Sequence, residues 1–165
     1  MFSDETELIQ RIAVALIRRK ERMGVAESCT GGLIGAACTS LPGSSQWFER
    51  GVVSYSDQSK TEFLGVPPAL IALHGSVSEV VAGHMARGLL AHAPLDWALA
   101  CTGIAGPSGG SDGKPVGTVW LAIAHEGKLL RCWCEHFGGD RQAVRLATVR
   151  AGLAALADAV EDRES

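Results

Sequence analysis

Aromatic residues are scarce in this chain, and basic residues do not outnumber acidic ones. Aromatic residues make up 5% of it, and 15 lysines and arginines stand against 18 acidic residues, which gives a net charge of −3. A nucleic-acid-binding surface needs basic side chains for phosphates and aromatic side chains for bases. The sequence therefore predicts no nucleic-acid partner. No apolar run approaches the ~20 residues that cross a bilayer, which argues against a membrane protein.

An even set of cysteines and a basic leader are also missing. The five cysteines form an odd set, and the first ten residues, MFSDETELIQ, are acidic where a secretory signal would be basic. We therefore expect reduced thiols and a cytoplasmic location. The cysteines are Cys29, Cys38, Cys101, Cys132 and Cys134.

What the chain does contain is typical of an α/β protein. Its 165 residues, 47% of them apolar, can bury a core, and we expect a single domain over residues 1–165. Helical and strand patterns alternate and a hairpin comes late, which predicts a mixed sheet between helix layers. Asp4 and Ser76 are the expected caps of two helices. Helices are predicted at 4–22, 33–40, 57–64, from 67 onward, at 76–93 and at 141–160, and strands at 23–26, 51–56, 95–101, 118–124 and 129–136.

A glycine-rich loop follows the buried strand predicted at 95–101. In open α/β sheets ligands bind beyond the carboxyl ends of strands, and glycines let backbone N–H groups come close to an anion. Lys114 and Arg141 are candidate charge partners for such an anion. The loop lacks the spacing of a P-loop and of a dinucleotide fingerprint. Its glycines are Gly103, Gly106, Gly109, Gly110 and Gly113.

The segment ESCTGG, residues 27–32, joins a predicted strand to a predicted helix. Such a junction offers free backbone N–H groups, and we expect Ser28 and Thr30 to form hydrogen bonds with substrate there. Ser28 is also a rival candidate for the nucleophile. Cys29 is another, because a helix N-terminus stabilises a thiolate, although we favour a small packed side chain at this position.

The main hypothesis concerns residues 43–60, GSSQWFERGVVSYSDQSK. A serine hydroxyl can attack a carbonyl without a cofactor when a neutral lysine amine takes its proton. We expect Ser45 to be that nucleophile and Lys60 that base, with Tyr55 orienting the lysine or relaying the proton. Backbone N–H groups near Ser28, or beside the nucleophile, would stabilise the oxyanion.

A metal site is the weaker alternative. Cys132, Cys134 and His136 alternate, so a strand would place them on one face. Side chains two apart on a strand are roughly 6.5 Å apart, which is wide for neighbouring zinc ligands. Packed small residues explain the pattern at least as well, and we expect no metal and no cofactor.

Five segments of the chain resemble the CinA C-terminal domain family, whose stand-alone members include nicotinamide-nucleotide amidohydrolases. The resemblance implies a three-layer α/β/α sandwich with a mixed, mostly parallel sheet, catalysis without a metal, and a possible homodimer. The segments are AESCTGG (26–32), GSSQWFERGVVSYS (43–56), HGSVSE (74–79), TGIAGPSGGSDGKPVGTVW (102–120) and GDRQAVR (139–145).

The resemblance also implies an activity and a set of site residues. The activity is hydrolysis of the carboxamide of nicotinamide mononucleotide to nicotinate mononucleotide and ammonia, in pyridine nucleotide recycling. The family's nucleophile, lysine and tyrosine fall on Ser45, Lys60 and Tyr55, while Ser28 and Ser44 also occupy motif positions. The small-molecule substrate, with its ribose and phosphate near the glycine-rich loop, is expected to contact Ser28, Thr30, Gly31, Thr102, Gly103, Gly106, Gly109, Gly110 and Arg141.

One departure from the family pattern concerns the expected base. Many members have asparagine where this chain has Asp57, three residues before Lys60. A carboxylate that faces the lysine would raise its pKa and slow it as a base. The alternative function is a non-catalytic nucleotide-binding or regulatory module, and a thiol enzyme using Cys29 is a third hypothesis.

Overall fold

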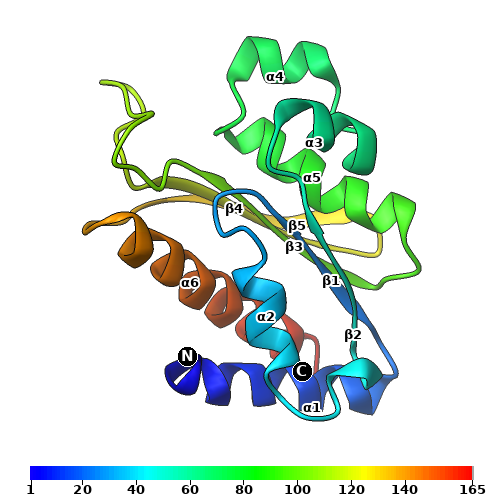
Figure 1. The fold of residues 1–165 in the computed structure, drawn as a ribbon. Helices are drawn as coiled ribbons and strands as arrows, with labels where there is room; N and C mark the ends of the chain where they lie inside the picture. The colour runs from blue at the N-terminus through cyan, green and yellow to red at the C-terminus, as the bar shows by residue number, and fades with distance from the viewer. Residues whose placement is uncertain (165) are drawn as a thin grey trace.

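A sheet of five strands lies between two layers of helices in the computed structural model, which describes residues 1–164 (Figure 1). This is the three-layer α/β/α sandwich that the sequence predicted. The helices are α1 (Thr6–Arg19), α2 (Leu33–Thr39), α3 (Asp57–Leu64), α4 (Pro68–His74), α5 (Glu79–His92) and α6 (Arg141–Glu161). The strands are β1 (Met23–Glu27), β2 (Phe48–Val53), β3 (Trp97–Gly103), β4 (Thr118–His125) and β5 (Lys128–His136). Short 3-10 turns cover Ser3–Glu5, Ser44–Gln46 and Asp162–Glu164.

The strand order in the sheet is β2-β1-β3-β4-β5. β1 pairs in parallel with β2 and β3, whereas β4 runs antiparallel to both β3 and β5. The sheet is therefore mixed and mostly parallel, with β4 reversed. Every residue of β1 is buried, as expected of a central strand that is covered on both faces. The carboxyl ends of β1, β2 and β3 meet at one edge of the sheet, where ligands of open α/β sheets bind.

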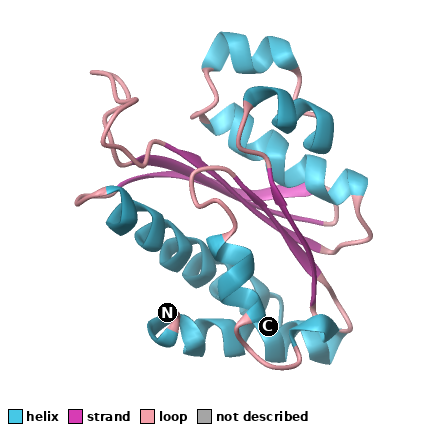
Figure 2. Ribbon diagram, in the orientation of Figure 1, coloured by secondary structure: helices cyan, strands magenta, loops and turns pink. Residues whose placement is uncertain are grey.

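The two helical layers are built around separate apolar cores. α1, α2 and α6 cover one face of the sheet, while α5 covers the other with α3 and α4 packed beside it (Figure 2). Leu16, Leu99 and Leu153 belong to the first core, and Leu64 and Met85 to the second. Within the described residues, no helix combines the length and the apolar character needed to cross a membrane.

A glycine seats α3 tightly against α5. A Cβ atom at Gly88 would lie 1.8 Å from the carbonyl oxygen of Leu64, the last residue of α3. No other side chain can occupy that space, so glycine at position 88 permits the close approach of the two helices. The contact fixes the position of α3, and α3 carries Lys60.

Two boundaries differ from the prediction in ways that matter for the site. β2 begins at Phe48 rather than at residue 51, and the carbonyl of the buried Trp47 already accepts a hydrogen bond from the Met23 N–H (2.8 Å). α5 is capped by Ser78 rather than by Ser76, because the Ser78 hydroxyl accepts from the Val81 N–H at 3.3 Å. Likewise, the predicted cap Asp4 lies in the 3-10 turn before α1 and does not cap that helix.

Candidate active site

Lys60 is a buried lysine at the carboxyl edge of the sheet. It lies on the first turn of α3, a helix capped by the Ser56 hydroxyl, and is 1% exposed. Its amine donates hydrogen bonds to the Ser28 hydroxyl oxygen (3.2 Å) and to the carbonyls of Ser54 (2.8 Å) and Tyr55 (3.2 Å). These three acceptors hold the amine at one point, directly beside a serine hydroxyl.

Ser28 follows the last residue of β1, and Ser54 follows the last residue of β2. The two strands are parallel neighbours, and the Ser54 N–H donates to the Glu27 carbonyl at 2.8 Å, which continues their pairing. The ends of both strands therefore deliver groups to the Lys60 amine. Ser28 is 7% exposed, so its hydroxyl lies in a nearly dry environment.

The predicted contact between Ser45 and Lys60 is wrong. Ser44 and Ser45 lie in a 3-10 turn before β2, at the amino end of the strand, while Lys60 lies beyond its carboxyl end. The six residues of β2 span roughly 20 Å at about 3.3 Å each. The prediction failed because the segment between the serines and the lysine is an extended strand. The serine that meets the lysine is Ser28.

Burial is the main influence on the pKa of the Lys60 amine. Burial lowers the pKa of Lys60, because a charged amine loses hydration there, and the Asp57 carboxylate partly opposes this by raising it. The net pKa is lowered. Asp57 accepts a hydrogen bond from the Ser76 hydroxyl (2.5 Å), so this carboxylate is engaged with the loop that leads into α5 and not with the amine. The expected effect of Asp57 is therefore present in sign but is outweighed by burial.

The turn that carries Ser28 is anchored from within by Glu27, which is 1% exposed. One carboxylate oxygen accepts from the Thr30 hydroxyl (2.5 Å) and from the N–H groups of Gly32 (3.0 Å) and Ile34 (3.1 Å). The other accepts from the Gly35 N–H at 2.8 Å. Most of the backbone N–H groups that were predicted to be free at this junction therefore donate hydrogen bonds to Glu27. The Thr30 hydroxyl is likewise turned inward, contrary to its predicted contact with substrate.

The same turn is anchored from outside by Arg145 of α6. Its Nε donates to the Cys29 carbonyl (3.1 Å) and its Nη2 to the Thr30 carbonyl (3.0 Å). The Gly31 N–H closes the turn by donating to the Ser28 carbonyl at 3.0 Å, and Gly31 has a positive φ of 58°. Gly31 therefore shapes the turn, and its contact with substrate stays a prediction.

Cys29 lies beside a second thiol, and both are buried. The hydrogen bond with Cys101 lowers the pKa of the Cys29 thiol, and the same bond, with burial, raises the pKa of Cys101. The Cys101 sulfur also lies 3.2 Å from the Thr30 hydroxyl. No described histidine is hydrogen-bonded to Cys29, so this thiol lacks the histidine base of a Cys–His pair.

Tyr55 contributes its two ends to different parts of the site. Its carbonyl binds the Lys60 amine, while its hydroxyl accepts from the Arg141 Nη2 at 2.9 Å. Arg141 also donates from Nη1 to the Gly106 carbonyl at 2.9 Å. The tyrosine residue is 57% exposed. The structure thus brings Tyr55, Arg141 and the glycine-rich loop together, but it points the hydroxyl toward Arg141 instead of toward the lysine.

The glycine-rich loop is held by its own packing as well as by Arg141. A Cβ atom at Gly106 would lie 2.4 Å from Val116, and one at Gly110 would lie 2.8 Å from the Val116 backbone nitrogen. These glycines are needed where the two arms of the loop meet. Gly103 ends β3 in register with Val119, and Gly109 is exposed with a φ of 93°.

Thr102 and Lys114 bind the segment before α5. The Thr102 hydroxyl donates to the Ser76 carbonyl (2.9 Å), and the Lys114 amine donates to the His74 carbonyl (2.8 Å). Thr102 is 1% exposed, so its hydroxyl serves the fold of this corner. Lys114 ties down the tip of the loop and does not stand free as an anion partner.

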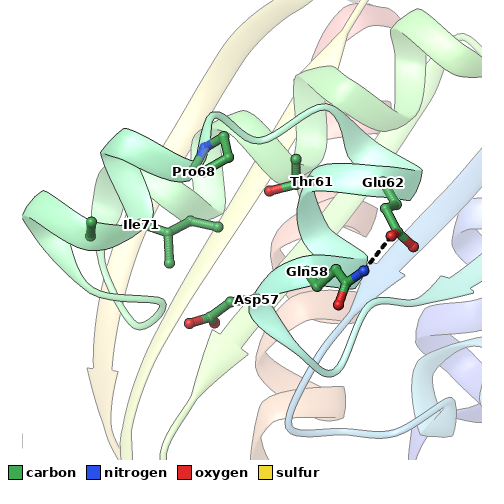
Figure 3. Close-up of a pocket in the computed structure, with 7 residues that line it drawn as sticks. Asp57, Gln58, Thr61, Glu62, Pro68 and Ile71 are labelled. Atoms are coloured by element: carbon green, nitrogen blue, oxygen red, sulfur yellow. Dashed lines mark hydrogen bonds between the residues drawn. The ribbon is translucent and has the colours of Figure 1, made fainter.

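Two cavities lie close to the elements that hold the Ser28–Lys60 pair, although their lining residues do not include Ser28 or Lys60. The larger, about 660 Å³, is lined by the glycine-rich loop and the start of α6, including Ala105, Pro107, Arg141 and Arg145. The other, about 500 Å³, lies between α3 and α4 (Figure 3). Its lining residues are Asp57, Gln58, Thr61, Glu62, Pro68, Ile71 and Ala72, and the Gln58 amide donates to the Glu62 carboxylate at 2.6 Å.

The alternating residues of β5 do not form a cluster of metal ligands. The Cys132 thiol approaches the Glu79 carbonyl (3.6 Å), while the sulfur of Cys134 lies 3.9 Å from His136 Nε2. In the part of the chain that the structure describes, no three His, Cys, Asp or Glu side chains gather in a way that could hold a metal ion.

The comparison with known sequences places the chain in a family. The sequence model of the CinA C-terminal domain matches residues 5–160.

The chain belongs to the CinA C-terminal domain family.

Two curated members of the CinA family differ in length. The nicotinamide-nucleotide amidohydrolase PncC of Shigella flexneri is 47% identical over 143 residues, covering 87% of this chain and 87% of that protein. A CinA-like protein of Syntrophus aciditrophicus is 48% identical over 151 residues, covering 91% of this chain. The chain spans 36% of that longer protein.

A solved structure of the CinA family has the same fold. A competence/damage inducible protein from Agrobacterium tumefaciens superimposes with a TM-score of 0.93 at 41% identity, and the match covers 98% of both chains. The fold described above is therefore that of the family along nearly its whole length.

Three features of the site could not be found from the sequence. Glu27 and Ser54 lie within the segments AESCTGG and GSSQWFERGVVSYS, but nothing in the local sequence distinguishes a buried carboxylate or a carbonyl that binds an amine. Arg145 lies within the segment GDRQAVR that carries the family resemblance. Its acceptors lie 115 and 116 residues earlier in the chain, so only the fold brings them together.

Proposed function

We propose that this protein hydrolyses the carboxamide of nicotinamide mononucleotide, with Ser28 as nucleophile and Lys60 as general base. The observation that carries the proposal is the buried Lys60 amine, 3.2 Å from the Ser28 hydroxyl, with its pKa lowered by burial. The name of the Shigella relative, an amidohydrolase of nicotinamide nucleotides, supports the choice of substrate. The reaction would return the pyridine nucleotide to biosynthesis as nicotinate mononucleotide.

The geometry suits a neutral lysine. A neutral amine has two N–H donors and one lone pair. In that neutral state the carbonyls of Ser54 and Tyr55 take the two donors, and the hydrogen bond with Ser28 reverses, so that the lone pair accepts from the Ser28 hydroxyl. The Ser28 proton then moves to Nζ as Oγ forms a bond to the carboxamide carbon, and the carbonyl oxygen becomes an oxyanion.

The second half of the reaction reverses the proton transfer. The C–N bond breaks and the proton on Nζ moves to the departing nitrogen, which releases ammonia and leaves an ester on Ser28 Oγ. Lys60 next takes a proton from water, whose oxygen attacks the ester carbon, and returns that proton to Oγ. The products are the carboxylic acid and free Ser28, so one water is consumed per carboxamide.

We assign the substrate's remaining groups to the larger cavity, which is lined by Arg145, the residue that binds the Ser28 turn. Its volume of about 660 Å³ lies in the range of small-molecule sites. Arg141 stands at its edge with its guanidinium partly bound to the Gly106 carbonyl and exposed to solvent. A guanidinium is the preferred partner of a phosphate, so we assign the phosphate of the mononucleotide to Arg141 and the loop backbone.

The decisive experiment measures ammonia release from nicotinamide mononucleotide by wild type, Ser28→Ala, Lys60→Met and Ser45→Ala. Loss of a nucleophile or its base costs at least about 10³-fold in kcat, so the first two variants should be nearly inactive. Ser45→Ala is the matched control, since that hydroxyl lies at the opposite end of β2, and it should retain wild-type activity.

Two results would overturn this assignment in different ways. An active Ser28→Ala enzyme beside an inactive Ser45→Ala enzyme would restore the serine that the sequence favoured. Tight binding of the mononucleotide by wild type without any ammonia after long incubation would favour a non-catalytic nucleotide-binding module instead.

A further inference from the structure

Arg145 is a charged side chain that binds the backbone of the active-site turn. Its two hydrogen bonds go to consecutive carbonyls, those of Cys29 and Thr30, in the turn that begins with Ser28. An arginine guanidinium is a planar fork, so two adjacent acceptors fix both its position and theirs. A substrate-binding role alone would not require that both of these N–H groups face the protein's own backbone.

Because the peptide bond is planar, the hydrogen bond from Arg145 to the Cys29 carbonyl also fixes the direction of the Thr30 N–H. In a planar trans peptide the C=O and the N–H point in opposite directions. The Cys29 carbonyl shares its peptide group with the Thr30 N–H. Since Arg145 draws that carbonyl toward α6, the Thr30 N–H is turned away from α6.

The Thr30 N–H has no acceptor among residues 1–164, whereas its neighbour, the Gly31 N–H, donates to the Ser28 carbonyl. α6 lies on one face of the sheet, and Lys60 arrives from α3 on the other. The Thr30 N–H is therefore a donor without an acceptor in the described structure, and it is directed away from α6, toward the layer from which Lys60 arrives.

We propose that Arg145 is a positioning residue that holds the Thr30 N–H ready to stabilise the oxyanion formed when Ser28 attacks the carboxamide. This proposal rests on the proposed function, because the oxyanion exists only if the carboxamide is hydrolysed. Such a donor acts mainly on the transition state, where the oxygen carries its charge. Arg145 itself does not touch the reacting atoms.

The matched test compares Arg145→Met, Arg145→Lys and Arg150→Met. Arg150 is an exposed arginine on the same helix and serves as the control. We expect Arg145→Met to lower kcat about 10- to 100-fold, less than the full loss of an oxyanion donor, with KM within about threefold of wild type. Arg145→Lys should be intermediate, because an ammonium cannot reproduce the two-pronged grip. Arg150→Met should match wild type.

A thiocarboxamide analogue of the substrate sharpens the test. Sulfur accepts hydrogen bonds weakly, so wild type should prefer the oxygen substrate, and this preference should shrink in Arg145→Met but not in Arg150→Met. A rise in KM at unchanged kcat would overturn the proposal and make Arg145 a phosphate ligand. Full activity in Arg145→Lys would also overturn it, since only the charge would then matter.

Amide resonances separate failure of this proposal from failure of the proposed function. The ¹H–¹⁵N signals of Cys29 and Thr30 in the ligand-free protein should shift or broaden in Arg145→Met and stay unchanged in Arg150→Met. Unchanged amide signals of Cys29 and Thr30 in Arg145→Met would refute the positioning role of Arg145, even if the wild-type enzyme is active. If wild type releases no ammonia while these signals shift in Arg145→Met, then Arg145 orders the turn, but the proposed function and the role of the Thr30 N–H toward an oxyanion are both refuted. If Arg145→Met fails to fold, Arg145→Lys carries both readouts.

Discussion

Replacing Glu27 with glutamine should loosen the turn that presents Ser28. Glutamine has nearly the same shape, but one of its two terminal atoms is an amide nitrogen that donates. If the remaining oxygen keeps the bonds to Thr30, Gly32 and Ile34, the nitrogen faces the Gly35 N–H, which stands 2.8 Å from the carboxylate in wild type. Two donors then oppose one another.

The size of the effect follows from these four hydrogen bonds. A lost bond to a charged acceptor that leaves a buried donor unpaired costs about 1.5–3 kcal/mol. The three bonds that survive become weaker as the charge is lost, but the cost of burying that charge disappears too, and we take these two contributions to cancel. The net loss of unfolding free energy is therefore about 2 kcal/mol. For a chain of this length that lowers Tm by roughly 4–8 °C.

Thermal and urea unfolding followed by circular dichroism measure this loss directly. Glu7→Gln is the matched control, because Glu7 is exposed on α1 and should change the unfolding free energy by less than about 0.5 kcal/mol. If Glu27→Gln unfolded at the wild-type midpoint, the carboxylate would not be holding the junction, and the anchoring role of Glu27 would be refuted.

Two further predictions concern α3. Asp57→Asn removes a carboxylate that raises the pKa of Lys60, so this pKa should fall further and the rising limb of the pH profile of kcat/KM should move to lower pH. Glu62→Gln on the same helix is the control and should leave that limb in place. An unmoved limb in Asp57→Asn would contradict the direction in which Asp57 shifts the pKa of Lys60. Gly88→Ala should lower the free energy of unfolding by at least about 2 kcal/mol, because its Cβ atom would meet the Leu64 carbonyl. Gly83→Ala is the control, since its Cβ atom would meet only a flexible leucine side chain. Equal midpoints of urea unfolding for the two variants would refute this prediction.

The pKa of Lys60 also gives stability a definite pH dependence. Because burial lowers this pKa in the folded protein, the unfolded chain binds more protons between the folded and unfolded pKa values. The contribution of Lys60 to stability therefore rises with pH through that window. The same deprotonation produces the neutral amine that the proposed mechanism needs, so activity and this stability contribution should rise together.

Local signals account for the parts of the fold that the sequence predicted. The continuous apolar runs of β1 and β3 and the hairpin at Glu126–Gly127 depend on neighbouring residues. The gathering of Arg141 with the glycine-rich loop follows from the rule that strand ends meet at one edge. These predictions needed only the type and order of the elements.

The predicted contact between Ser45 and Lys60 failed because it depended on distance through space. Ser45 is 15 residues from Lys60 and Ser28 is 32, so closeness in sequence favoured the pair that the fold keeps apart. The strand that starts at Phe48 separates Ser45 from Lys60, while the parallel pairing of β1 and β2 brings Ser28 to Lys60. The predicted start of β2 also lies three residues too late in the chain, which made the separation between Ser45 and Lys60 look shorter than it is.

The clamp of Arg145 on the Ser28 turn makes the geometry of the site a late event in folding. β1 and α2 are neighbours in the chain and can associate early. The carbonyls of Cys29 and Thr30 between them bind the guanidinium of Arg145, which lies 116 and 115 residues later in the chain. Contacts of such long sequence separation form slowly, because closing a large loop is entropically costly. Because α6 also supplies Leu153 to the first core, a newly made or refolding molecule would complete that core and order its Ser28 turn in the same event, the docking of α6.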